Sequence, residues 1–99
     1  MKALYKPAGE RMREIEVENE LRALQNLVGG YIEVIRLTTD LVFIINEEGK
    51  NNGMLYNCDI CDDMIFGSII AVGVKDEEFC DVPCNLERMC RLFPQFKED

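Results

Sequence analysis

The sequence predicts one α+β domain over residues 1–99, with a mostly antiparallel sheet of about five strands and two short helices. Apolar and acidic residues alternate in one segment, which is the period of a strand with one face on a core. β-branched and aromatic residues dominate three further segments, which is typical of strands. Apolar residues recur at helical spacing in two short segments, and the first of these helices is too short to be stable unless it packs on the sheet.

The first third of the chain is expected to supply two strands and the first helix. Residues 3–6 form a short strand that stops at a Pro-Ala-Gly turn, and residues 13–18 form the alternating strand. Asn19 is expected to cap the helix, which ends at Gly29 and Gly30.

The remaining elements follow from runs of apolar residues and their boundaries. Residues 31–37 and 41–46 are predicted to form an antiparallel hairpin. Residues 65–74 are predicted to form a long buried strand, in which Gly67 marks a bulge or a close backbone approach. Asn85 is expected to cap a last helix, which a proline closes.

The strongest chemical signal is the spacing of four cysteines in residues 57–99. Two close pairs have the spacing that lets four thiolates meet on one tetrahedral Zn²⁺ ion, and the predicted ligands are Cys58, Cys61, Cys80 and Cys84. The chain contains no His, so such a zinc site is expected to be closed and structural and not catalytic. The sequence therefore predicts a zinc ion that staples the C-terminal half.

A shared zinc ion places a condition on the chain between the two cysteine pairs. Ten extended residues span roughly 33 Å, whereas zinc lies about 2.3 Å from each sulfur. The chain must therefore bend near Gly67 or Gly73 if the pairs share one ion. Cys90 lies at helical spacing with apolar residues, so it is predicted to be core, and it is the substitute ligand if Cys84 lies too far away.

Two other interpretations of the cysteines stay open. The first is a thioredoxin-like redox pair, although the neighbouring aspartates disfavour the thiolate form that such a pair needs. The second is that the thiols are small buried hydrophobic groups. Disulfides are not expected, because the cysteines are odd in number and thiols stay reduced in the cytosol.

Charge and hydropathy restrict the partner and the compartment. The chain has 19 Asp and Glu against 11 Lys and Arg, a formal net charge of -8. This balance argues against direct binding of nucleic acid and favours basic surfaces. The N-terminal residues lack the apolar core of a signal peptide, and no run is long enough to span a bilayer. We therefore expect a cytoplasmic protein that does not bind membranes.

Acidic side chains are the candidate contacts for such a partner. Glu14, Glu16 and Glu18 are expected to project from one face of a strand, about 6.6–6.8 Å apart. A solvated edge strand that is guarded against aggregation accounts for the same ladder. The predicted contacts around the cysteine loops are Asp62, Asp63, Glu77 and Glu78.

Three stretches of the chain, residues 1–7, 24–33 and 46–50, resemble a family of small domains of unknown function. The most specific part is Leu27-Val28-Gly29-Gly30-Tyr31-Ile32-Glu33, and the resemblance covers residues 1–80. Such domains are carried by phages, prophages and mobile elements of low-GC Gram-positive bacteria. The four-cysteine set is a departure from the typical members.

The resemblance implies a non-enzymatic inhibitor of a host defence system. The chain looks similar to phage-encoded inhibitors of type II CRISPR nucleases, some of which are small metalloproteins. The implied partner is a basic surface of the guide-RNA-bound nuclease in the bacterial host, and the implied effect is to impede loading of target DNA. Two alternatives stay open: a protein that sequesters a nucleotide immune signal in a pocket with cationic donors, and a zinc-stabilised structural or regulatory module of the mobile element.

Overall fold

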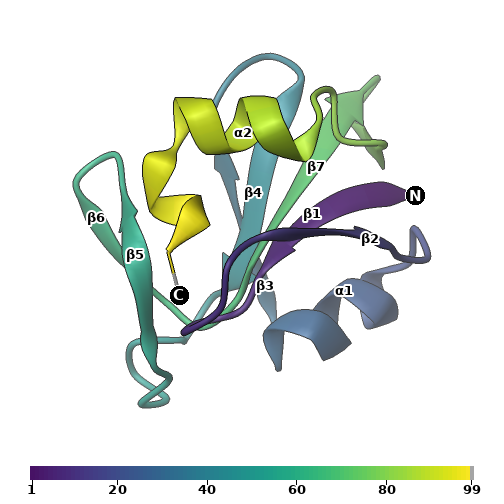
Figure 1. The fold of residues 1–99 in the computed structure, drawn as a ribbon. Helices are drawn as coiled ribbons and strands as arrows, with labels where there is room; N and C mark the ends of the chain where they lie inside the picture. Colours follow the sequence, from purple (N-terminus) through teal and green to yellow (C-terminus); the bar gives the residue numbers. More distant parts are fainter. Residues whose placement is uncertain (99) are drawn as a thin grey trace.

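Eight strands and two α-helices form between residues 1 and 98, the part of the chain that this computed structural model describes (Figure 1). The strands are β1 (Lys2–Lys6), β2 (Arg13–Glu16), β3 (Ile32–Arg36), β4 (Leu41–Asn46), β5 (Tyr56–Ile60), β6 (Asp63–Phe66), β7 (Ile69–Lys75) and β8 (Glu78–Cys80). The helices are α1 (Leu21–Val28), α2 (Leu86–Leu92) and the short 3-10 helix η1 (Pro94–Lys97). None of these helices is long and apolar enough to cross a membrane.

Every strand pair in this part of the chain is antiparallel. The main sheet has the order β2-β1-β7-β4-β3, and β8 pairs with the C-terminal end of β7. β5 and β6 form a separate two-stranded sheet. The predicted α+β class with an antiparallel sheet and two helices is therefore confirmed, whereas the β5–β6 hairpin was not expected.

The strand β4 is buried along its whole length, which shows that the main sheet has a core on each of its two faces. Val42 and Ile44 belong to the cluster that α1 covers, whereas Phe43 and Ile45 belong to the cluster covered by α2, η1 and the β5–β6 hairpin. Successive side chains of a strand point to opposite faces, which explains this division. The two α-helices therefore lie on opposite sides of the sheet (Figure 1).

The helix α1 forms as predicted, but its N-terminal cap is different. Glu20 is the capping residue and makes no side-chain cap hydrogen bond. The Asn19 side chain instead donates from Nδ2 to the Phe79 carbonyl oxygen at 2.7 Å. The cap prediction for Asn19 is wrong because a tertiary contact uses its amide. Gly29 ends the helix with φ +80, a conformation that favours glycine.

The predicted strand over residues 65–74 is divided at Gly67. β6 ends at Phe66 and β7 begins at Ile69, and Gly67 between them has φ +90. A Cβ atom at Gly67 would lie 2.9 Å from the Met54 Sδ atom. The chain therefore bends at Gly67, one of the two glycines at which a bend was expected. The prediction of one continuous strand is wrong, because the bend places β6 and β7 in different sheets.

The cysteine pairs were expected in the loops before and after the long strand, and the strand boundaries correct this for Cys58 and Cys80. Cys58 lies within β5, and Cys80 is the last residue of β8. Cys61 occupies the two-residue turn between β5 and β6.

The cap of the last helix is confirmed, because the Asn85 Oδ1 atom accepts a hydrogen bond from the Arg88 backbone N–H at 2.8 Å.

Candidate functional site

The four predicted zinc ligands lie in two separate parts of the fold. Cys58 is 5% exposed and faces the core from β5, whereas Cys61 is exposed in the adjoining turn. Cys80 pairs with Gly73 of β7, and Cys84 is partly buried just before α2. The β5–β6 turn and the β7–β8 hairpin lie on opposite sides of the molecule (Figure 1).

This arrangement does not fit a single zinc ion. Within residues 1–98, no three side chains of Cys, Asp or Glu are placed together so that they could hold a metal ion. Cys58, Cys84 and Cys90 instead lie in or against one apolar core cluster. Cys90 is partly buried and packs against the core, as predicted, and the geometry favours the interpretation of these three thiols as packed hydrophobic groups.

Burial also makes two of the thiols poor nucleophiles at neutral pH. It raises the pKa of the Cys58 thiol to about 11, although the nearby Lys6 ammonium opposes the shift. Burial likewise raises the pKa of the Cys84 thiol. Because the thiolate is the form that binds metals and attacks disulfides, protonated thiols at these two positions disfavour the redox interpretation as well.

Serine substitutions distinguish the packed thiols from a zinc staple. Cys61→Ser is expected to change the free energy of unfolding by less than about 0.5 kcal/mol, because this side chain is exposed. Cys58→Ser is expected to cost about 1–3 kcal/mol, because it places a hydroxyl in an apolar core. Urea unfolding measures both. Losses of several kcal/mol in both variants, with one zinc per chain in elemental analysis, would contradict this geometry and restore the zinc staple.

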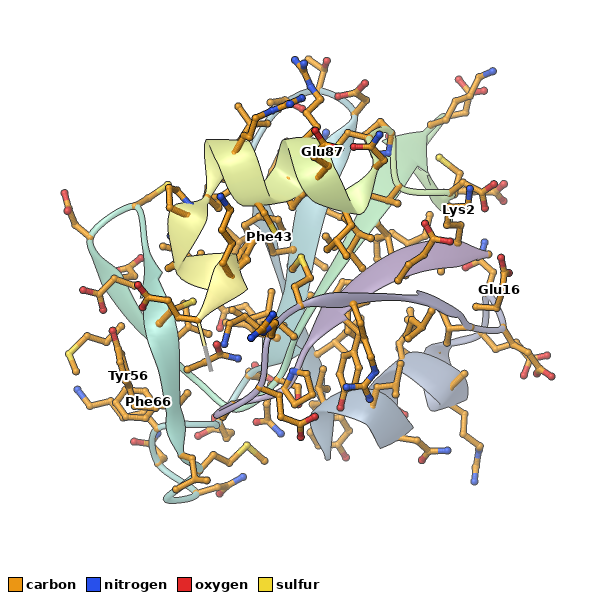
Figure 2. All side chains as sticks on the ribbon, in the orientation of Figure 1. Lys2, Glu16, Phe43, Tyr56, Phe66 and Glu87 are labelled. Carbon is orange, nitrogen blue, oxygen red and sulfur yellow. The ribbon has the colours of Figure 1, made fainter. Side chains whose placement is uncertain are left out.

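The acidic residues predicted as partner contacts are all exposed, but they do not form one surface. Glu14 and Glu16 share a face of β2, which is an outer strand of the main sheet. Glu18 lies beyond the end of β2, so the predicted ladder is shorter than expected. Asp62 and Asp63 lie at the β5–β6 turn, on the other side of the molecule from Glu16 (Figures 1 and 2).

Hydrogen bonds bring the end of β2 and the β7–β8 hairpin together at one corner. Lys2 pairs with Glu16 across β1 and β2, and its backbone N–H donates to Asp81 Oδ1 at 2.8 Å. The bond from Asn19 Nδ2 to the Phe79 carbonyl oxygen makes a second link. We call the exposed carboxylates on these linked segments the acidic corner, in which the N-terminal ammonium group lies 3.5 Å from Glu16: Glu16, Glu18, Glu20, Glu77, Glu78 and Asp81.

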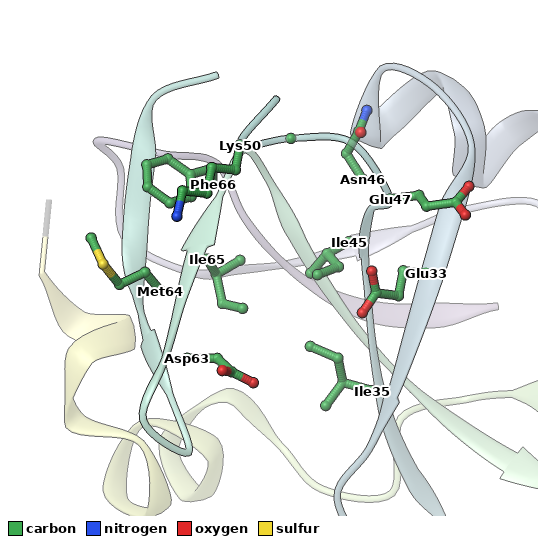
Figure 3. A pocket seen from close by; sticks show the side chains of 11 residues that line it. Glu33, Ile35, Ile45, Asn46, Glu47, Lys50, Asp63, Met64, Ile65 and Phe66 are labelled. Carbon is green, nitrogen blue, oxygen red and sulfur yellow. The ribbon is translucent and has the colours of Figure 1, made fainter. Parts of the chain in front are cut away.

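A groove of about 230 Å³ lies between β6 and the β3–β4 edge of the main sheet (Figure 3). Its lining includes the apolar residues Ile35, Ile45 and Ile65 and the charged residues Glu33, Glu47, Lys50 and Asp63. The lining holds three carboxylates and one ammonium group. This excess of negative charge disfavours the binding of an anionic nucleotide in the groove. Among these lining residues, only Asp63 was predicted as a contact. Glu33 and Lys50 were missed because no local sequence pattern connects them with Asp63.

Comparison with protein families matches residues 1–95 to a domain of unknown function, DUF3846. The chain belongs to this family. The match agrees with the predicted resemblance to a small domain of unknown function and extends beyond residue 80, so that it includes all five cysteines. No curated protein and no solved structure matches the chain. The family carries no functional description, so the phage origin stays a prediction.

The segment that carries most of the resemblance shapes the end of α1 in this DUF3846 domain. Val28 is buried, and its carbonyl oxygen accepts a hydrogen bond from the Asn46 side chain at 3.0 Å. A Cβ atom at Gly30 would lie 3.0 Å from the same Asn46 amide nitrogen, which leaves little room for a side chain. Tyr31 is 73% exposed. The segment therefore joins α1 to β3 and leaves Tyr31 and Glu33 on the surface.

Proposed function

We propose that this chain is a non-enzymatic binding module that docks its acidic corner on a basic surface of a partner protein. The partner to test first is the one that the family resemblance implies, a guide-RNA-bound type II CRISPR effector nuclease in the cytoplasm of the bacterial host. Docking at the surface that receives DNA would impede loading of the target. The module would act by occupying that surface and not by modifying the nuclease.

The observation that carries this proposal is the acidic corner itself. Its carboxylates come from the end of β2, the β2–α1 connection, the β7–β8 hairpin and the segment after β8, and hydrogen bonds hold these segments together. Exposed carboxylates held in one place complement Lys and Arg and steer the association of a basic partner.

A nuclease that binds nucleic acid offers the complementary surface. Such enzymes hold the guide–target duplex in a positively charged channel, where Lys and Arg contact phosphates. Carboxylates on a small protein present the same sign of charge as the phosphates do. The formal net charge of -8 favours this association over direct contact with the nucleic acid.

A DNA-cleavage assay with purified nuclease and guide RNA tests the proposal. We expect cutting to fall when the protein is in molar excess and is added before the DNA, and we expect both proteins to elute together from a sizing column. Undiminished cutting without a complex would remove the nuclease as the target. Calorimetric binding of cyclic or ADP-ribose nucleotides would instead favour the sequestering alternative.

A further inference from the structure

The strand β6 has a free edge beside the groove at Met64, whereas its last residue, Phe66, packs closely against Gly49. Within the part of the chain that the structure describes, β6 pairs with β5 alone. Ile60 and Asp63 face each other across the two-residue turn, and this position is a hydrogen-bonded pair in such hairpins. The next residue, Met64, therefore directs its N–H and C=O away from β5. An unpaired strand edge is a template for the addition of another strand.

The side chains around this edge form an apolar centre flanked by carboxylates. Ile65 of β6 points across the groove toward Ile45 of β4 (Figure 3). Asp63 and Glu33 turn inward from the two walls, whereas Met64 points away from the groove (Figure 3). A segment lying here would meet both apolar groups and negative charges.

We infer that the groove binds an extended basic segment of the partner protein, which pairs with β6 as the third strand of the small sheet. The inference rests on the proposed function, because it names the part of a basic partner that this module holds. Charge complementarity selects the occupant, since Glu33, Glu47 and Asp63 outnumber Lys50. A third strand also completes a sheet that has only two, the smallest and least stable kind.

The size of the groove agrees with an extended chain and not with an enclosed small molecule. Its volume of about 230 Å³ is below the range of roughly 300–1,000 Å³ that is usual for pockets enclosing drug-sized ligands. An extended segment needs contact on one edge and one face only, because the rest of its backbone stays in water.

The probe is a synthetic octapeptide, Arg-Thr-Val-Thr-Arg-Thr-Val-Thr, with both ends capped, titrated into the ¹⁵N-labelled full chain. One face of this peptide as a strand alternates Arg and Val, which matches the groove. We expect amide shifts to concentrate at Glu33, Met64 and Ile65, and we expect exchange of the Met64 amide hydrogen to slow. The matched peptide with Glu in place of Arg is expected not to bind. Equal binding of both peptides, or shifts elsewhere, would overturn the inference.

Charge reversals in the chain locate the site independently of the shifts. Asp63→Lys and Glu33→Lys, both at exposed positions, are expected to weaken peptide binding by about tenfold. The control Glu10→Lys makes the same charge change at an exposed turn outside the groove and is expected to weaken it by less than about threefold. Loss of binding in Glu78→Lys but not in the groove variants would overturn the inference and leave the acidic corner, and with it the proposed function, standing.

Discussion

Phe43→Ala is expected to lower the free energy of unfolding by about 3–5 kcal/mol. Phe43 lies in β4, an inner strand of the main sheet, and is fully buried. Its ring makes edge-to-face contacts with Phe93 and Phe96, whose ring centroids lie 5.2 and 5.5 Å away. Alanine would leave a cavity between the main sheet and the C-terminal helices, so these helices should lose their principal anchor.

Tyr56→Ala is the matched control for Phe43→Ala. Tyr56 also lies in a strand and makes an edge-to-face contact, with Phe66 at 5.8 Å, but its side chain is 47% exposed. Its removal is expected to cost about 0.5–1.5 kcal/mol. Urea unfolding of the three proteins gives the comparison. Equal losses in the two variants would contradict the core assigned to the α2 side of the sheet.

Gly73→Ala is expected to cost about 1–3 kcal/mol and to loosen β8 from β7. A Cβ atom at Gly73 would lie 2.3 Å from the Asp81 carbonyl oxygen and 2.9 Å from the Cys80 Sγ atom. The Asp81 oxygen is backbone, so the segment after β8 must shift as a whole. This segment carries Asp81 of the acidic corner. The variant therefore tests whether the packing of β7 positions part of the proposed docking surface.

Hydrogen exchange distinguishes this local effect from a general loss of stability. The Cys80 amide of β8, which lies opposite Gly73 of β7 in a hydrogen-bonded pair, is expected to exchange faster in Gly73→Ala than in the parent chain. Gly53→Ala is the control, because Gly53 also resists a side chain through its φ of +70 but has no atom within 4 Å of the added Cβ. Unchanged exchange at Cys80 in Gly73→Ala would show that β8 is not packed against this glycine.

Local sequence patterns predicted the first four strands and α1 because these elements depend on nearby residues. The alternation in residues 13–18 and the glycine pair after α1 each specify a local conformation. The β5–β6 hairpin escaped prediction because its turn lacks glycine: Cys61 and Asp62 occupy it with φ of +50 and +69. Cysteine at such a position gives no turn signal, and the metal-like spacing favoured a loop instead.

The candidate surfaces could be predicted only in part, because tertiary pairing assembles them. The exposure of Glu16 and Glu18 followed from a strand pattern, but their position beside Glu78 depends on the pairing of β8 with β7. Cysteine spacing could not establish a shared zinc ion, because the bend at Gly67 carries β7 into the main sheet. The groove brings together Glu33 and Asp63, which lie thirty positions apart in the sequence, so no local pattern could predict it.

The affinity of charge-reversed chains for the guide-bound nuclease tests the central claim, docking through the acidic corner, most directly. Glu18→Lys/Glu78→Lys reverses two exposed charges of the corner, and Glu10→Lys/Glu48→Lys reverses two exposed charges outside it. We expect the corner variant to bind at least about tenfold more weakly than the parent chain, and the control to stay within about threefold. Equal losses in the two variants, or no binding of the parent chain, would contradict docking through the acidic corner.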